Sequence, residues 1–182
     1  MAPRAAAGFN TLGLHKLIYL IGTQHEHQLV RKNRTSYPFC HFLKKEFNGK
    51  SIDLFAEESC EDAICCRGAI GSVVKETAHS LKINHLFCEP TLKQNKELGI
   101  KCREEILKEL LHIPDPDEQG RQADVAQQQY EPVREKIWKE KLSGHKFNNC
   151  FFVLGAKHDS SFKKLLSDDG IEVFVLNENW RP

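Results

Sequence analysis

The sequence lacks an apolar run long enough to cross a membrane. A membrane-spanning helix needs about 18 consecutive apolar residues, no run in the 182 residues approaches that length, and the mean hydropathy is -0.49. The first part of the chain carries Arg4, His15 and Lys16 among short apolar stretches, without the continuous apolar block of a secretory signal. We therefore expect a cytoplasmic protein with no membrane partner.

The chain also lacks an excess of charge of either sign. It has 26 Lys and Arg residues against 25 Asp and Glu residues, which gives a formal net charge of +1. A protein that binds the phosphate backbone of nucleic acid usually carries a basic excess. The charge therefore gives no reason to expect nucleic acid as a partner.

Cysteine pairs of the kind that bind zinc are missing as well. The seven cysteines form no Cys-x-x-Cys pair and no zinc-ribbon spacing. Seven is an odd number, and free cysteines most often pack as small apolar side chains. We expect reduced, mostly buried thiols, with a nucleophilic cysteine as the minor alternative.

Five short apolar runs predict a buried sheet, because strands covered on both faces are continuously apolar. The runs are residues 17–21, 52–56, 83–88, 150–154 and 171–176. Stretches with helical spacing alternate with them, at residues 38–47, 61–81, 93–111, 133–142 and 161–166. This order predicts one α/β domain over residues 1–182, with a mostly parallel open sheet of about five strands and helices on both faces.

Two segments of the chain are less regular in sequence. We expect residues 1–14 to form a flexible N-terminus. Residues 112–129 are rich in Pro, Asp and Gln, which predicts a surface connection that is partly helical toward its end, with a lid as the alternative. Pro132 suits the first turn of the helix that follows.

Two further segments match each other in kind at almost every position. Residues 19–26 read YLIGTQHE, and residues 152–159 read FVLGAKHD. Each is a predicted strand followed by glycine (Gly22 or Gly155), two residues, histidine (His25 or His158) and an acid. Glycine lets the chain turn sharply or brings backbone close to a ligand, and ligands bind at the carboxyl edge of a parallel sheet. We therefore predict a shared site that contains both histidines.

Acids follow the other predicted strands, so that their carboxylates would lie at the same edge. Glu57 and Glu58 come after the second strand, and Glu89 comes after the third. One of Glu57 and Glu58 is expected to face the site, and the sequence leaves open which one. Glu26, which directly follows His25, belongs to the same predicted edge.

With these residues in place, the sequence resembles the TraB/Tiki-like superfamily, which includes erythromycin esterase-like proteins and haem-binding ChaN-like proteins. The resemblance rests on four segments in order: GTQHE (22–26), AEES (56–59), REKIWKEKL (134–142) and GAKH (155–158), the last leading into FKKLLSDDGIEVFVL. It covers most of the chain, but residues 93–129 match nothing in the family.

The resemblance implies a site made of the two histidines, a strand-end glutamate and a helical arginine, here His25, Glu57 or Glu58, Arg134 and His158. Some members are hydrolases, described as metalloproteases or esterases, and others are non-enzymatic. His25, Glu58 and His158 would form a divalent-metal site for Mn, Fe, Co or Zn, with a bound water as nucleophile. Without metal, a histidine would act as general base, a glutamate would orient the water, and Arg134 would stabilise negative charge.

These patterns predict a small hydrolase that acts on an ester, amide or peptide bond of a small molecule or peptide. One alternative is a non-enzymatic binding module of the same fold, which would hold a metal, haem or a small anion. Another is an amidohydrolase-like enzyme that uses His25 and His27 as ligands, although the barrel of that class needs a longer chain. An exposed sheet edge is also compatible with a homodimer.

Overall fold

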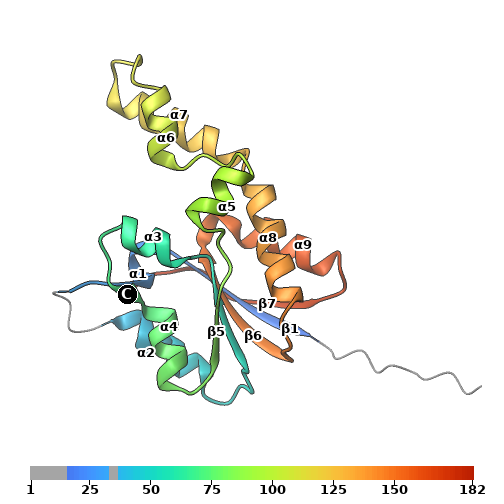
Figure 1. The fold of residues 1–182 in the computed structure, drawn as a ribbon. Coiled ribbons are helices and arrows are strands. Elements are labelled where there is room, and N and C mark those ends of the chain that lie inside the picture. The colour runs from blue at the N-terminus through green and yellow to red at the C-terminus, as the bar shows by residue number, and fades with distance from the viewer. Residues whose placement is uncertain (1–15, 33–36) are drawn as a thin grey trace, which may run out of the picture.

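Five parallel strands form the central sheet of the protein (Figure 1). The structure is a computed structural model and describes residues 16–32 and 37–182, so the expected flexible N-terminus at residues 1–14 lies outside the described residues. The strand order is β5-β3-β6-β1-β7. The strands are β1 (Leu17–Thr23), β3 (Leu54–Glu57), β5 (Asn84–Phe87), β6 (Asn149–Gly155) and β7 (Glu172–Trp180). The predicted α/β fold with a parallel sheet is confirmed.

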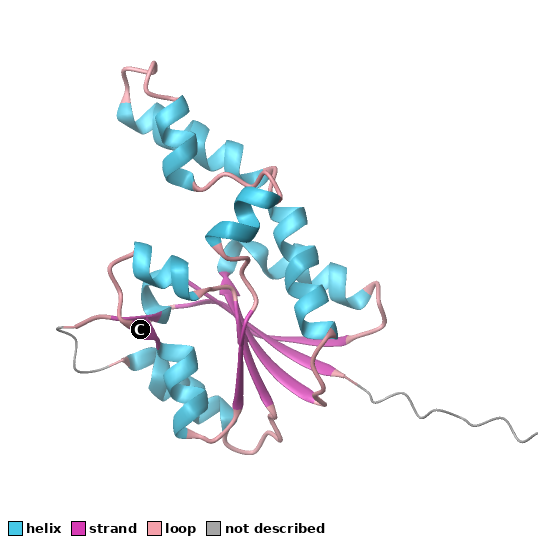
Figure 2. Ribbon diagram, viewed as in Figure 1, coloured by secondary structure: helices cyan, strands magenta, loops and turns pink. Residues whose placement is uncertain are grey.

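Helices cover both faces of this sheet (Figure 2). One face carries α2 (Pro38–Phe47) and α4 (Val73–Ser80), and the other carries α8 (Glu131–Ser143) and α9 (Asp159–Ser167). The shorter elements are α1 (His25–Gln28), α3 (Glu61–Cys66), α5 (Leu92–Glu97), the turn η1 (Ala156–His158), and the antiparallel pair β2 (Leu29–Val30) and β4 (Gly71–Ser72). No helix in the described ranges is long and apolar enough to span a membrane.

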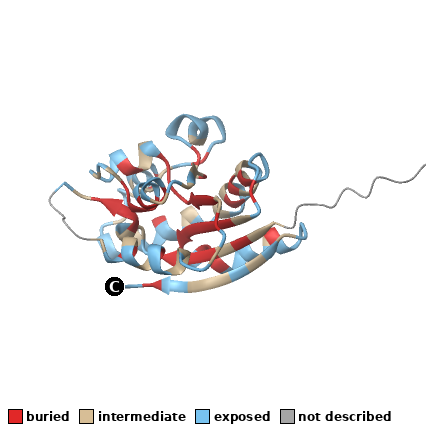
Figure 3. Cartoon of the chain, turned by 90° about the horizontal axis from the view of Figure 1, so that it is seen from below, coloured by how far each residue is buried: buried red, intermediate tan, exposed pale blue. Residues whose placement is uncertain are grey.

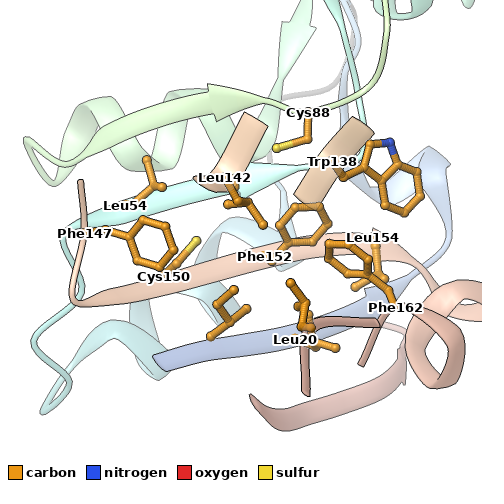
Figure 4. Packing of buried hydrophobic residues seen from close by; sticks show 13 residues of the cluster. Leu20, Leu54, Cys88, Trp138, Leu142, Phe147, Cys150, Phe152, Leu154 and Phe162 are labelled. Atoms are coloured by element: carbon orange, nitrogen blue, oxygen red, sulfur yellow. The ribbon is translucent and has the colours of Figure 1, made fainter. Parts of the chain in front are cut away.

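Strand β6 shows why the predicted strands are continuously apolar. Phe152 and Leu154 pack with α8 and α9, whereas Phe151 and Val153 pack with α2 and α4. Figure 4 shows the first of these clusters, and Figure 3 shows that the central strands are buried while the edge strand β7 is more exposed. Successive side chains of a strand point to opposite faces, and both faces are covered here.

Two of the predicted helical stretches are interrupted by glycines with positive φ. Residues 61–81 divide into α3, β4 and α4, with Gly68 at φ 64° after α3. Residues 93–111 divide into α5 and α6 (Arg103–Glu109), with Gly99 at φ 68° between them. Glycine adopts this left-handed backbone without steric strain and ends each helix. The apolar spacing on its own did not show these breaks.

Residues 116–128 form a regular helix, α7 (Pro116–Gln128), where the sequence indicated a connection that is helical only toward its end. Asp115 caps the helix by accepting a hydrogen bond from the N–H of Asp117. The helix pairs with α6 in a hairpin that projects away from the sheet (Figure 1), and only Ala123 is buried along it. The next helix, α8, has Pro132 in its first turn, as predicted.

The first motif glycine is required by close packing rather than by its backbone angles. A Cβ atom at Gly22 would lie 2.2 Å from the carbonyl oxygen of Glu178 and 2.4 Å from Oδ2 of Asp159, whereas the φ of Gly22 is not positive. We predict that Gly22→Ala lowers the free energy of unfolding by about 1–3 kcal/mol, because overpacking forces neighbouring groups apart. Urea unfolding measures this change.

Gly144→Ala is the matched control for this substitution. A Cβ atom at Gly144 would meet its nearest neighbour, the Lys141 carbonyl oxygen, at 3.5 Å, an ordinary contact distance. We expect the control to unfold near the wild-type urea concentration. Equal unfolding midpoints for the two variants would contradict the steric explanation.

Candidate functional site

The carboxyl ends of β1, β3 and β6 bring both motif histidines to one carboxylate. His25 opens α1 shortly after β1, Glu58 follows β3, and His158 closes η1 after β6. The Nε2 atom of His25 lies 3.7 Å from Oε1 of Glu58, and the Nε2 atom of His158 lies 3.6 Å from the same oxygen. The two motifs therefore meet at a single oxygen atom, although they are far apart in the sequence.

Arg134 of α8 links this carboxylate to a second one. Its Nη2 donates to Oε1 of Glu58 at 2.7 Å, while Nε and Nη2 donate to the two oxygens of Glu89 at 2.8 and 2.9 Å. Trp138 adds a hydrogen bond from its indole N–H to Glu89 at 3.0 Å, and Lys141 donates to the Glu89 carbonyl at 2.8 Å. These α8 residues are spaced by four and then three positions, which places them on one face of the helix.

Glu57 and Glu58 point to opposite faces of the sheet, because consecutive residues of a strand alternate. Oε1 of Glu57 accepts a hydrogen bond from Ser72 at 2.5 Å and lies 2.7 Å from Nε2 of His85. Ser72 also caps α4 by accepting from the N–H groups at the start of that helix. The structure therefore brings Glu58 to the motif histidines and leaves Glu57 with α4 on the opposite face.

Glu58 is a buried carboxylate that stays ionised. Its Oε2 accepts a hydrogen bond of 2.7 Å from the backbone N–H of Gly155. Burial raises the pKa of Glu58, but the protonated form of His25, the charge of Arg134, the protonated form of His158 and the N–H of Gly155 lower it by more, so that the pKa is about 2. Both oxygens are therefore held as acceptors at neutral pH.

His158 is fully buried and held by two neighbours. Its Nδ1 lies 2.9 Å from Oε1 of Glu135, which also accepts a hydrogen bond from Ser161 at 2.6 Å. The ring of Trp138 packs edge-on at 5.0 Å. Its Nε2 has no hydrogen-bond partner within residues 16–32 and 37–182. The sequence did not identify Glu135, although it directly follows Arg134.

A cavity of about 60 Å³ opens above the cluster. It is lined by His25, Leu29, Glu58, Ser59, Ala63, Arg67, Glu89 and Arg134. The side chain of His25 is 31% exposed and that of His158 is fully buried, so the cavity reaches only the first histidine. Burial lowers the pKa of His25, Glu58 raises it, and Arg67 and Arg134 lower it. The net shift is downward from 6.5, so His25 is neutral near pH 7.

The second motif glycine is also explained by close approach. A Cβ atom at Gly155 would lie 3.2 Å from Oε2 of Glu58 and 3.2 Å from Nε2 of His25, and the φ of Gly155 is −64°. Two other predicted residues lie outside the cluster. Glu26 is exposed and pairs with Arg31 at 2.7 Å, and the His27 ring packs against Trp180 at 5.3 Å. The amidohydrolase hypothesis needed His25 and His27 as a ligand pair, and the Trp180 contact does not favour it.

No protein-family model matches the sequence, and the comparisons with curated proteins and with solved structures gave no match either. The resemblance to the TraB/Tiki-like superfamily therefore stays a prediction that rests on the motifs.

The geometry does not favour a divalent ion at this site. In the described part of the chain, no group of three or more His, Cys, Asp or Glu side chains is placed to hold one. His25, His158 and Glu58 offer two nitrogen donors and one oxygen, but the Arg134 guanidinium already donates to the Glu58 oxygen that both imidazoles face. A dication there would be repelled by the guanidinium. With Arg134 in this position the three side chains do not fit the metal.

Cysteine takes no part in the cluster. All seven cysteines are free, but only three are buried, so the expectation of mostly buried thiols was too broad. Burial raises the pKa of the Cys88 and Cys150 thiols, which keeps both protonated at neutral pH. No cysteine lines the cavity beside His25.

Asp159, the acid of the second motif, is a buried carboxyl group beside β1. Neither of its side-chain oxygens has a hydrogen-bond partner among the described residues. Burial and the nearby charge of Glu178 raise the pKa of Asp159 from 3.8 to about 7, although His158 opposes the shift. Below about pH 7 the folded protein therefore holds Asp159 mainly in its protonated form.

This shift predicts a pH-dependent loss of stability. Because the folded pKa lies above the unfolded one, the contribution of Asp159 is complete below about pH 4 and is lost as the pH rises through about 7. We predict that the free energy of unfolding of the wild type falls relative to Asp159→Asn by a few kcal/mol between those limits. Urea unfolding of both proteins at several pH values measures it. Parallel pH curves would contradict the assignment.

Proposed function

We propose that the protein is a small hydrolase in which His25 is the general base. The observation that carries the proposal is the cavity itself, where the Nε2 atom of His25 and the guanidinium of Arg134 approach the same oxygen of Glu58. A neutral base and a fixed cation beside one small cavity are what the hydrolysis of an acyl bond requires.

His25 would accept a proton from a water molecule in the cavity. The water oxygen forms a bond to the acyl carbon of an ester or amide, the bond to the leaving group breaks, and His25 returns its proton to the leaving group. Glu58, an ionised carboxylate 3.7 Å from Nε2, stabilises the imidazolium that forms in between. The lowered pKa of His25 keeps it able to accept a proton at neutral pH.

Arg134 would stabilise the negative charge that develops on the acyl oxygen. Its Nε and Nη2 groups are held by Glu58 and Glu89, whereas Nη1 donates no hydrogen bond within the described ranges. Burial lowers the pKa of Arg134, but the two carboxylates raise it by more, so the group stays charged. A fixed charge in a site partly shielded from water needs no reorganisation during the reaction.

Three residues of the cluster act through their neighbours. Glu135 fixes the ring of His158, His158 faces the inner side of Glu58, and Glu89 holds Arg134. Neither His158 nor Glu135 lines the cavity. We therefore assign positioning roles to Glu135, His158 and Glu89. His25 and Arg134 would contact the substrate.

The size of the cavity limits what enters it. Sites for drug-sized ligands have volumes of about 300–1,000 Å³, and this cavity measures about 60 Å³. The bond to be cleaved fits, while the rest of a small-molecule or peptide substrate would remain outside. The same volume does not favour haem and narrows the non-enzymatic alternative to a small anion.

The first test compares His25→Gln with His27→Gln. Both variants remove one imidazole from the same short helix, but His27 packs against Trp180 instead of the cavity. We expect His25→Gln to reduce kcat/KM by about 10²–10⁴-fold on a reactive p-nitrophenyl ester, and His27→Gln to stay near the wild type. The wild-type kcat/KM should rise with pH through a pKa below 6.5 and then level off, because burial depresses the pKa of His25.

Unchanged turnover in His25→Gln would reject His25 as the base. A ligand that binds saturably without turnover on ester, peptide and phosphoester panels would favour a binding module instead. Elemental analysis of protein purified without chelator tests the metal expected from the sequence. About one equivalent of Mn, Fe, Co or Zn that is lost in a His25→Ala, His158→Ala variant would require Arg134 to move away from Glu58. Cytoplasmic localisation and a homodimer remain predictions of the sequence.

A further inference from the structure

Arg67 is a charged residue at the cavity that the catalytic proposal does not use. It follows α3, and it lines the cavity with His25, Glu58 and Arg134. Figure 1 shows α3 beside α1. Arginine remains protonated at every physiological pH, so this residue brings a permanent positive charge to the wall of the cavity.

The backbone of Arg67 is fixed while its side chain is free. Its N–H donates to the carbonyl oxygen of Ala63 at 3.2 Å, and its own carbonyl oxygen accepts a hydrogen bond from Arg31. Arg31 is in turn paired with Glu26. The guanidinium of Arg67 makes no hydrogen bond or ion pair within residues 16–32 and 37–182.

The other charges of the cavity are already compensated. Glu58 and Glu89 both accept hydrogen bonds from Arg134, at 2.7 to 2.9 Å. Arg67 therefore has no carboxylate in the cavity left to neutralise. The positive charge of Arg67 nevertheless acts on His25, because Arg67 is one of the groups that lower the pKa of His25.

We propose that Arg67 recognises an oxyanion of the substrate, a carboxylate or phosphate group that lies beside the bond to be cleaved. A guanidinium presents two parallel N–H donors that match the oxygens of either group. Because the cavity admits only the reacting bond, the charged group of the substrate stays at the cavity wall, where Arg67 lies. The site is thereby selective for anionic esters or amides over neutral ones.

This inference rests on the proposed function for the identity of the reaction, but the binding step can be measured without turnover. The ring proton signal of His25 in an NMR spectrum, assigned by its loss in His25→Gln, reports on ligands that enter the cavity. The probes are succinate, inorganic phosphate and the neutral succinamide. We expect succinate or phosphate to shift the signal saturably and succinamide to leave it unchanged; whichever anion binds more tightly identifies a carboxylate or a phosphate as the preferred group.

Three variants separate recognition by Arg67 from a general charge effect. Arg67→Gln removes the guanidinium, Arg67→Lys keeps the charge without the paired donors, and Lys75→Gln removes a nearby cation that pairs with Glu61 at the start of α3. We expect the anion Kd to increase at least about tenfold in Arg67→Gln. The increase should be smaller in Arg67→Lys, and Lys75→Gln should match the wild type.

Turnover provides the second measurement. The ratio of kcat/KM for p-nitrophenyl hemisuccinate to that for p-nitrophenyl butyrate measures the preference for an anionic acyl group. This ratio should fall at least about tenfold in Arg67→Gln, mainly through KM, and should not change in Lys75→Gln.

The outcomes distinguish this inference from the proposed function. Anion binding that depends on Arg67, with no turnover of any ester, supports the oxyanion site and rejects the hydrolase. Turnover that depends on His25, with anion binding and substrate preference unaffected by Arg67→Gln, supports the hydrolase and rejects the oxyanion site. A wild-type His25 signal that neither succinate nor phosphate shifts would also overturn the role of Arg67.

Discussion

The ion pair between Glu58 and Arg134 is the interaction on which the rest of the site depends. The side chains are 1% and 18% exposed, so both charges have lost most of their contact with water. Such a pair is tolerated only when the remaining polar atoms also find partners. Here the N–H of Gly155 donates a hydrogen bond to the second oxygen of Glu58. Glu89 accepts hydrogen bonds from Nε and Nη2 of Arg134. Removing one partner would leave an uncompensated buried charge, which destabilises proteins by about 3–5 kcal/mol.

Helix α8 connects the hydrophobic core to this ion pair. Leu142 and Trp138 are buried in the core layer that also contains Phe152, so the packing of the helix on the sheet fixes its rotation. The residues one turn before Trp138 are Arg134 and Glu135, which reach Glu58 and His158 respectively. Trp138 itself contacts two residues of the site: its indole N–H donates to Glu89, and its ring packs against His158. The same packing that stabilises the fold therefore determines the position of the charged groups.

The parts of the fold that the sequence predicts are those with a strong local signal. Continuous apolar runs marked all five strands of the sheet, because both faces of a parallel sheet are buried. Helix α7 was missed as a regular element because its stability comes from the cap at Asp115 and from packing on α6, and it has few apolar residues that would show a helical period. The breaks at Gly68 and Gly99 depend on a positive φ that the helical spacing around them conceals.

For the site, the motifs identified the residues that the structure brings together, but not which neighbour each one faces. The choice between Glu57 and Glu58 depends on which face of β3 meets α8, and this is a property of tertiary packing. Glu135 was missed because an acid on a helix is usually solvated, and only tertiary packing brings this one to His158. Arg67 is exposed, and no spacing in the sequence relates it to the motifs. Each of these residues is placed at the site by a contact between segments that are distant in the chain.

The two motifs are similar in sequence, but their histidines lie in different surroundings. Strand β6 lies between β1 and β3, and Gly155 is paired with Thr23, so the second motif starts one residue beyond the first along the shared edge. The side chain of His158 is fully buried beside Glu58, whereas the partly exposed His25 approaches the same oxygen from the cavity. A buried imidazole fixed by Glu135 is suited to holding a carboxylate in place, and a partly exposed neutral imidazole is suited to accepting a proton. In the proposed mechanism the duplication thus supplies one histidine for positioning and one as the general base.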